Sequence, residues 1–399
     1  MAEVADVHPQ VSRFEQKACA NPPSRNDEPD ESAQMLFLRK ENQRLARQIE
    51  KLKDAEGFRE EVLVTIREAV EALEPLPLIL YKRPPKSSAE IAAVIKKSDW
   101  HIGARISAAE TEGFGEFNWD IAQLRVRYIT DKFIASIQAN RQIHDIRKLY
   151  IFGEGDWVSG DIHEELVRTN EFPLPVQAVN AGNLLAEAVG VLAPHFEEVH
   201  LIEVSPDNHG RLERKPQFKQ KAQNNMSFVT YSMANALLRE HRNVFPYLAP
   251  GIKHVQKVNG VNFLIEHGDT VRAWMGIPAY GMERERGREA AKRMQAMMDT
   301  VRGFENYQKD IGFDYMSCGH WHVPGVVSGN ILINGSLTGT DEFDHGCGRH
   351  APPAQVSFLV HSKHKIFNWT PWTVFTTPDR AQQGGSPVRH TELHGKVAA

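Results

Sequence analysis

The sequence predicts an α/β domain with a largely parallel β-sheet, preceded by an N-terminal coiled-coil helix. Three observations predict it: short apolar runs alternate with longer helical patterns, an all-strand region follows them, and a heptad repeat of leucines precedes them. The chain has 399 residues, enough for one large or two ordinary domains, and its apolar content of 41% is typical of a globular protein.

The first 74 residues divide into two segments. Residues 1–32 are polar and are expected to form a disordered leader. Three leucines then recur every seven residues: Leu38, Leu45 and Leu52. Asn42 lies four residues after the first leucine, at a seam position where an asparagine fixes register and partner number. We expect residues 33–74 to form a coiled-coil or amphipathic helical segment that joins copies of the chain into a homo-oligomer. The alternative is a single helix that packs on its own domain.

Residues 75–376 contain the alternating pattern and are expected to form one domain. Strand character is found in five short runs: Ile91–Lys97, Lys148–Phe152, Val199–Val204, Val261–Glu266 and Phe313–Ser317. Helical patterns lie between these runs, at about 121–147, 176–196, 227–243 and 283–309. A later region resembles the strands of a second sheet: Val323–Leu337, Val356–Leu359 and Lys365–Phe375. The polar tail, residues 377–399, is expected to be disordered.

Two lysines do not fit a buried strand. Lys96 and Lys97 occupy the end of the first predicted strand, where a parallel sheet normally carries apolar side chains. Either the strand ends before them or they line an open cleft.

Charge and cysteine content limit the classes of function. The 47 basic and 51 acidic side chains give a net charge of −4, so a nucleic-acid partner would have to contact local basic patches. Cys19, Cys318 and Cys347 are too few and too scattered for a disulfide framework, which indicates a reducing compartment. No apolar run approaches the roughly 20 residues that span a bilayer, and the N-terminus has no apolar signal core. We therefore expect a cytoplasmic protein with no membrane partner.

Residues that can bind metal ions follow the predicted strands. They are Asp99, His101, Asp156, Asn208, His267, His320 and His322. Because ligands of α/β sheets gather beyond the carboxyl ends of the strands, these side chains are expected to converge. Carboxylate, amide and imidazole donors together suit manganese, iron or zinc. They do not indicate a zinc site made of cysteine thiolates.

The order and spacing of these residues resemble the calcineurin-like metallophosphoesterase superfamily. Its pattern is Asp-x-His, Gly-Asp, Gly-Asn-His-Asp/Glu, a lone His and Gly-His-x-His. The resemblance covers about residues 99–340 and implies a four-layer α/β/β/α sandwich of two mixed β-sheets. It also implies two divalent metal ions, with Mn²⁺ the expected ion and Fe or Zn the alternatives. By that resemblance one ion binds Asp99, His101, Asp156 and His322, and the other shares Asp156 and adds Asn208, His267 and His320.

The same resemblance implies a mechanism. Two metal ions about 3.5–4 Å apart can hold a bridging hydroxide and clamp a phosphoryl group for in-line attack. His209 directly follows a proposed ligand and is the predicted general acid for the leaving oxygen. The group that orients it stays open: Ser159 stands where relatives often carry the orienting residue, and Asp161, His163 or no residue are the alternatives.

The sequence departs from the superfamily pattern beside Asn208. Asp207 replaces the preceding glycine, and Gly210 followed by Arg211 replaces the acidic residue after His209. We consider three residues as candidates for contacting the substrate: Arg211, His163 and Asp161.

Within the superfamily, the segment from Asn334 to Phe343 resembles most the DNA-repair exonuclease branch and its phage-type relatives. Two basic clusters could hold a nucleic-acid backbone: Arg211, Arg214, Lys215, Lys219 and Lys221, and Arg284, Arg286, Arg288, Lys292 and Arg293. The alternative for the second cluster is a solvated helix face. We expect a two-metal phosphodiesterase, exonuclease-like, with DNA as substrate. The alternatives are a phosphomonoesterase, a small-nucleotide phosphodiesterase, or a non-catalytic metal-bound scaffold.

Overall fold

The computed structural model describes residues 40, 75–78, 90–213, 215–273, 278–301 and 312–374. The predicted leader, the coiled-coil segment apart from Lys40, and the C-terminal tail lie outside these residues. Apart from Lys40, the described residues belong to a single compact unit, residues 68–399.

A six-stranded sheet has the order β11-β10-β1-β2-β3-β4. Four strands run parallel: β1 (Glu90–Lys97), β2 (Asp145–Gly153), β3 (Glu198–Glu203) and β4 (Val244–Leu248). An antiparallel hairpin, β10 (Ala354–His361) and β11 (Lys365–Thr373), is added beside β1. The parallel strands all end at the same edge of the sheet, so the loops that follow them start close together.

A five-stranded sheet has the order β5-β6-β7-β9-β8. Its strands are β5 (His254–Val258), β6 (Val261–Ile265), β7 (Tyr315–Cys318), β8 (Gly325–Val327) and β9 (Ile331–Ile333). Strands β6, β7 and β9 are parallel, while β5 and β8 are antiparallel edge strands. The later strands were expected to form this second sheet together. That expectation was wrong for β10 and β11, because their backbone pairs with β1.

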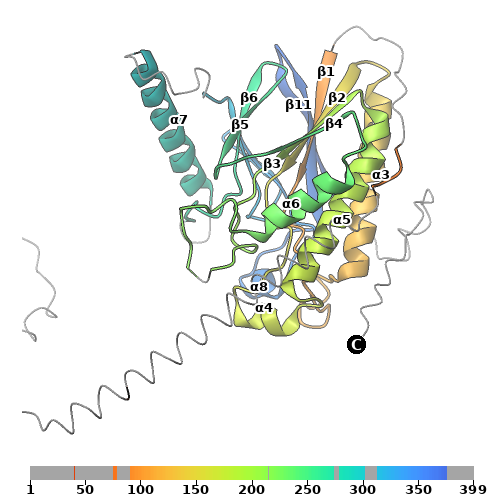
Figure 1. Ribbon diagram of the computed structural model, residues 1–399, viewed down its shortest axis with the longest axis vertical. Coiled ribbons are helices and arrows are strands. Elements are labelled where there is room, and N and C mark those ends of the chain that lie inside the picture. The colour runs from red at the N-terminus through yellow and green to blue at the C-terminus, as the bar shows by residue number, and fades with distance from the viewer. Residues whose placement is uncertain are drawn as a thin grey trace, which may run out of the picture. The chain divides into compact units, whose positions relative to one another are not determined.

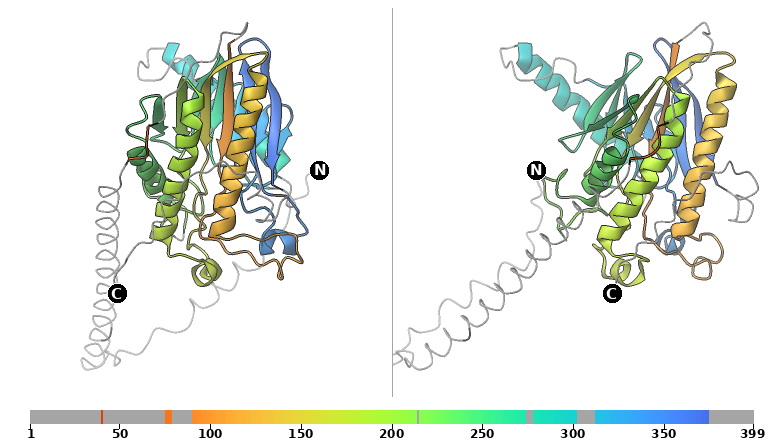
Figure 2. Two further views of the ribbon diagram at one scale, coloured as in Figure 1. Left: turned by 90° about the vertical axis from the view of Figure 1, so that its right-hand side faces the viewer. Right: turned by 45° about the vertical axis from the view of Figure 1, so that its right-hand side comes forward.

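Helices cover the outer face of the six-stranded sheet, and one helix lies beside the five-stranded sheet (Figures 1 and 2). Helices α3 (Trp119–Asn140), α5 (Leu174–Leu192) and α6 (Met226–Leu237) pack on the six-stranded sheet. Helix α7 (Ala279–Val301) contacts the other sheet through Met282, which lies in one cluster with Met316 and Ile331. Three short helical elements complete the described chain: α4 (Glu164–Thr169), η1 (Ala193–His195) and α8 (Glu342–Gly346).

The core between the two sheets is apolar and aromatic. Phe152, Phe263 and Phe358 lie with their ring centroids 5.5–6.4 Å apart and are almost fully buried. A second apolar cluster fills the space between the six-stranded sheet and α3, α5 and α6. In the described residues two mixed β-sheets thus pack face to face with flanking helices, as the predicted sandwich requires.

Two predicted helices are too long. The first, expected to reach residue 147, ends at Asn140, because residues from Asp145 pair with β1 as strand β2. The third, expected to reach residue 243, ends at Leu237 and is followed by β4. Strand β4 was not predicted; it is a partly exposed edge strand with Pro246 at its centre, so its apolar pattern is weak.

Helix α5, together with η1, is long and apolar enough to cross a membrane by length and composition alone, at 22 residues. No such run was expected from the sequence. Two thirds of its most apolar window is buried, and the helix packs against α3 and α6. Burial in the protein core therefore accounts for its composition.

Neither expectation for the two lysines holds, because the strand continues through both and both are buried. Lys96 points between the sheets, where its Nζ atom donates to the backbone oxygens of Cys318 (3.0 Å) and Leu332 (2.7 Å) and pairs with Glu154 at 3.3 Å. The Nζ atom of Lys97 lies 5.4 Å from the ring centroid of Trp100, and burial lowers its pKa to about 8.

Candidate metal centre

The loops that follow β1, β2, β3, β6 and β7 bring the predicted ligands together. The backbone has an unusual conformation at five of these ligand residues. These have a positive φ: Asp99 (56°), His101 (46°), Asp156 (51°), His320 (68°) and His322 (59°). The left-handed region is unfavourable for residues with a Cβ atom, and each such residue costs on the order of 1–3 kcal/mol. These five residues lie together, and their conformation turns donor atoms toward a common volume.

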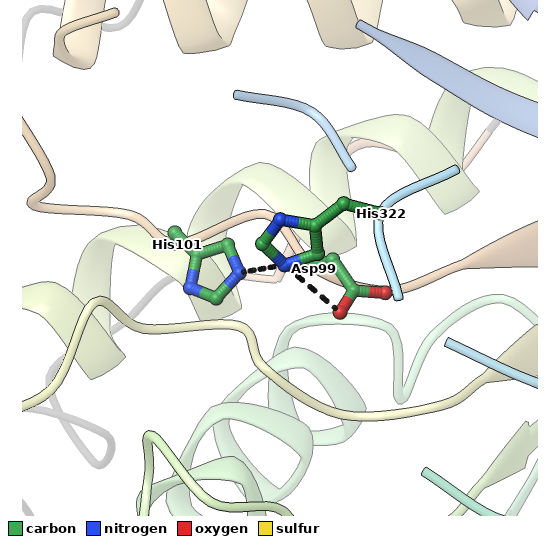
Figure 3. Close-up of side chains that lie close together, drawn as sticks. All are labelled: Asp99, His101 and His322. Carbon is green, nitrogen blue, oxygen red and sulfur yellow. Dashed lines mark hydrogen bonds and ion pairs between the residues drawn. The ribbon is translucent and has the colours of Figure 1, made fainter. Parts of the chain in front are cut away.

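Three overlapping groups of donor atoms lie within that volume, and within each group all atoms lie within 4.8 Å of one another. The groups are Asp99, His101 and His322; His101, Asp156 and His209; and Asp156, His267 and His320. Figure 3 shows the first group, in which the Nε2 atoms of His101 and His322 are 3.0 Å apart. Both nitrogen atoms therefore point into one small volume, and neutral imidazole is the commonest protein metal ligand.

Asp156 connects two donor sites. Its Oδ2 atom lies 3.1 Å from Nε2 of His267, and the same Nε2 lies 2.9 Å from Oδ1 of Asn208. Asp156 also belongs to the group that contains His101. All seven predicted ligands are therefore placed at one site, with the Asp156 carboxylate in the middle.

Neighbouring groups fix how the histidine rings are turned. Nδ1–H of His267 donates to the backbone oxygen of Glu154 at 2.7 Å, so its Nε2 atom faces the donor site. Nδ1 of His322 lies 3.7 Å from the Asp344 carboxylate of α8, and its Nε2 atom faces Asp99 at 3.7 Å. Carboxylates and carbonyls behind a histidine set its tautomer in metal sites. Asp344 was not predicted: it directly follows the segment from Asn334 to Phe343, and no sequence pattern links it to His322.

Burial and neighbouring charges shift the protonation of the site. Burial lowers the pKa of His320 to about 3, so its imidazole is neutral and free to bind a cation. For His322 the effect of burial is outweighed by Asp344 and Asp99, which raise its pKa to about 9. Burial likewise opposes the charge on Asp156, but His267 and His209 hold the pKa of its carboxyl well below the usual range. Anionic oxygens and imidazole nitrogens in this arrangement fit a pair of divalent ions.

Asp207, noted above only as a departure from the superfamily pattern, supports the centre. It is fully buried, and its carboxylate accepts the backbone N–H of Asp156 at 2.8 Å and that of Gly210 at 2.7 Å. It also accepts hydrogen bonds from the side chains of Asn225 and Ser227. A glycine at this position could make none of these side-chain bonds, so Asp207 holds the loops after β2 and β3 together.

His209 is oriented by a backbone group. Its Nδ1 atom lies 2.6 Å from the backbone oxygen of Ser159, while its backbone N–H donates to Oδ1 of Asp156 at 3.1 Å. The side chains of Asp161 and His163 were the alternatives for this role. The ring of His163 has its centroid 6.5 Å from that of His209, close enough to face the same substrate but too far to orient the ring.

The other two candidate substrate contacts are placed differently. Arg211, two residues after His209, forms an isolated bridge with Asn225 and donates from Nε to the backbone oxygen of Glu213 at 3.1 Å. Burial is the main cause that lowers the pKa of His163, followed by the charges of His209 and Arg211. The side chains of Arg211 and His163 therefore interact electrostatically. Asp161 is partly buried, which raises the pKa of its carboxyl, and no contact between Asp161 and the donor groups is found in the described structure.

Comparison with known proteins gives low similarity. No family model matches the chain, and no curated protein sequence matches it. Among solved structures, it is similar to Vps29 complexed with zinc from Entamoeba histolytica, with 13% identity, a TM-score of 0.26, and coverage of 70% of this chain and 98% of that one. A predicted phosphoesterase from Streptococcus pneumoniae shows 10% identity, a TM-score of 0.23, and coverage of 71% and 97%. Values this low do not assign the chain to a family.

Proposed function

We propose that this protein is a two-metal-dependent phosphodiesterase of the calcineurin-like metallophosphoesterase superfamily, and that its substrate is a nucleic acid. The observation that carries the proposal is the position of Asp156, whose carboxylate is shared by two donor groups at the edge where five loops meet. A single metal site would need no such shared carboxylate. Two sites that share one are suited to in-line displacement at phosphorus.

Each residue at the centre has a role in this proposal. When bound, the two ions would activate water and neutralise charge on the phosphoryl oxygens. Asp99, His101, Asp156 and His322 would hold one ion, and Asp156, Asn208, His267 and His320 the other. His209 can hold a proton on Nε2 and donate it to the leaving oxygen, because its Nδ1–H is engaged by Ser159.

Exposed aromatic side chains near the centre support a nucleic-acid substrate. Phe114 is 55% exposed and has its ring centroid 5.6 Å from that of His345 and 5.5 Å from that of His350. Phe343, 68% exposed, lies beneath the guanidinium of Arg349. His345 and Phe343 belong to α8, the helix whose Asp344 contacts His322. Exposed rings with nearby cations are a common platform on which unpaired bases stack.

A panel of substrates tests the proposal. With Mn²⁺ added, the full chain should hydrolyse bis-(p-nitrophenyl) phosphate and a single-stranded oligonucleotide, and a chelator should abolish both reactions. Hydrolysis of p-nitrophenyl phosphate alone would favour the phosphomonoesterase alternative. Failure to hydrolyse any substrate, with two equivalents of metal bound, would favour the scaffold and contradict the proposal.

A further inference from the structure

A cavity of about 270 Å³ lies between the loop that follows β6 and the first turns of α7. Its lining includes the arginines Arg272, Arg284 and Arg288, together with Thr270 and Glu285. It therefore combines residues from two segments, and three of its side chains carry a permanent positive charge.

The positive charge of this cavity is not neutralised from within. Among the described residues, no carboxylate pairs with any of the three arginines. Glu285 does line the cavity, but its carboxylate is engaged by Lys253, whose Nζ atom lies 2.7 Å from Oε1. Arg284 and Arg288 stand four residues apart on α7, so their like charges are neighbours on one helix face, an arrangement that is unfavourable without an anion.

Other basic residues of α7 form ion pairs with carboxylates of the same helix. Arg286 pairs with Glu283 at 3.5 Å, and Lys292 and Arg293 pair with Glu289 at 2.6 Å and 3.3 Å. These residues form the solvated, ion-paired helix face that was the alternative interpretation of the cluster. Arg284 and Arg288 are therefore set apart from them by their place in the cavity.

A glycine brings the two segments together. A Cβ atom at Gly281 would lie 2.1 Å from the backbone oxygen of Arg272, so only glycine allows the start of α7 to approach this loop so closely. Arg284, about one turn further along α7, lines the same cavity as Arg272. Backbone packing at Gly281 therefore holds the two segments that line the cavity against each other.

The cavity is close to the metal centre along the chain. Arg272 is five residues after His267, so their Cα atoms are at most roughly 18 Å apart. The loop between them is held in place: Asp269 pairs with Lys221 at 2.9 Å, and Gly268 packs against Gly319 and His320. Phosphates of one strand in a duplex are spaced by about 3.4 Å along the axis, so this distance corresponds to a few nucleotides.

We propose that Arg272, Arg284 and Arg288 bind a non-scissile phosphate of a nucleic-acid strand whose scissile phosphodiester lies at the metal centre. This inference rests on the proposed function and adds a specificity site to it. Planar guanidinium groups that converge on one cavity bind phosphate in bidentate fashion. A small phosphodiester has no phosphate besides the scissile one, so in this proposal the three arginines favour polymers over small substrates.

The test is a triple variant with Arg272→Gln, Arg284→Gln and Arg288→Gln, compared with the wild type and with the matched control Arg286→Gln. Neutralising one phosphate of a single strand contributes about 0.7 to the salt dependence, so the triple variant, which loses one phosphate contact, should lose about 0.7 from the slope of log(kcat/KM) against log[salt] on a single-stranded oligonucleotide. At 0.1 M salt that corresponds to a loss of about fivefold relative to 1 M salt. Activity on bis-(p-nitrophenyl) phosphate should change less than about twofold, and Arg286→Gln should resemble the wild type on both substrates.

A second measurement separates this inference from the proposed function. Fluorescence anisotropy of the same oligonucleotide with the full chain in chelator reports binding without cleavage, and the triple variant should show the same loss of slope. The inference is overturned if the triple variant keeps the wild-type slope, or if its activity falls equally on both substrates. If the wild type cleaves neither substrate, the phosphodiesterase proposal fails, and the anisotropy experiment still decides whether the arginines bind a strand.

Discussion

The Nδ1 atom of His209 lies 2.6 Å from the backbone oxygen of Ser159, so a carbonyl group, rather than a carboxylate, orients this histidine. A carbonyl oxygen can only accept, which fixes the proton on Nδ1 and leaves Nε2 to exchange a proton with the substrate. Because a carbonyl carries no full charge, it stabilises the imidazolium less than a carboxylate would.

Replacing His209 with alanine separates proton donation from metal binding. A positioned general acid contributes about 10²–10⁴-fold, and a sugar alkoxide needs this help far more than a nitrophenolate does. His209→Ala should therefore lose most activity on DNA, much less on bis-(p-nitrophenyl) phosphate, and keep its metal content. Kinetics on both substrates with metal analysis check this, with the exposed His364→Ala as control.

Equal losses on the two substrates with intact metal content would instead indicate that His209 stabilises the phosphoryl oxygens electrostatically. Loss of metal would show that His209 is a ligand, a role that its place in one donor group with His101 and Asp156 also permits.

Replacing Asp207 with asparagine should weaken the centre without removing a ligand. The amide can accept at only one of its two ends, so the backbone N–H of Asp156 or of Gly210 loses its acceptor. Hydrogen bonds to a buried charged group contribute about 1.5–3 kcal/mol, and loss of a group that supports a metal ligand typically lowers metal affinity 10–100-fold. Thermal unfolding and metal titration should both show the change, whereas the exposed Asp120→Asn should show neither. An unchanged metal affinity would mean that Asp207 has no part in holding the site.

The layered fold and the metal ligands could be predicted from the sequence because both depend on local patterns. Short apolar runs indicated β1, β2, β3, β6 and β7, and the ligands directly follow these strands. What could not be predicted depends on contacts between distant segments. Asp344 contacts His322 from a separate short helix, and β10 pairs with β1 across more than 250 residues. Lys96 can be buried only because Glu154 pairs with its ammonium group and two backbone carbonyls accept its hydrogen bonds.

Glu203 should make the stability of the protein depend on pH. It is fully buried on β3 with Asn235 as its hydrogen-bond partner, and burial raises its pKa from 4.5 to about 8. Between these values the folded state binds more protons than the unfolded state, so the free energy of unfolding falls as pH rises, by about 1.4 kcal/mol per pH unit.

The variant Glu203→Gln removes this titration. It should be more stable than the wild type at pH 8.5 by a few kcal/mol, and the difference should shrink toward pH 5. Urea unfolding at the two pH values measures it, with the exposed Glu240→Gln as control. A stability difference that does not vary with pH would show that Glu203 is ionised in the folded protein.

The heptad leucines lead to a prediction about assembly. The full chain should form a homo-oligomer through residues 34–56, and a 75–399 truncation should have fewer protomers, because the seam would be missing. Light scattering on both proteins measures the protomer number. The same number in both would contradict the coiled-coil interpretation and favour a helix that packs on its own domain.

The metal content of the Asp156→Asn variant tests the central claim most directly. If the Asp156 carboxylate bridges two ions, an amide in its place lowers the occupancy of both sites, whereas His101→Ala, which removes a ligand from one site, chiefly lowers one. Metal analysis after loading with Mn²⁺ should therefore find two equivalents in the wild type, about one in His101→Ala, and well below one at each site in Asp156→Asn. Two full equivalents in Asp156→Asn would contradict a shared carboxylate and, with it, the two-metal centre proposed for this protein.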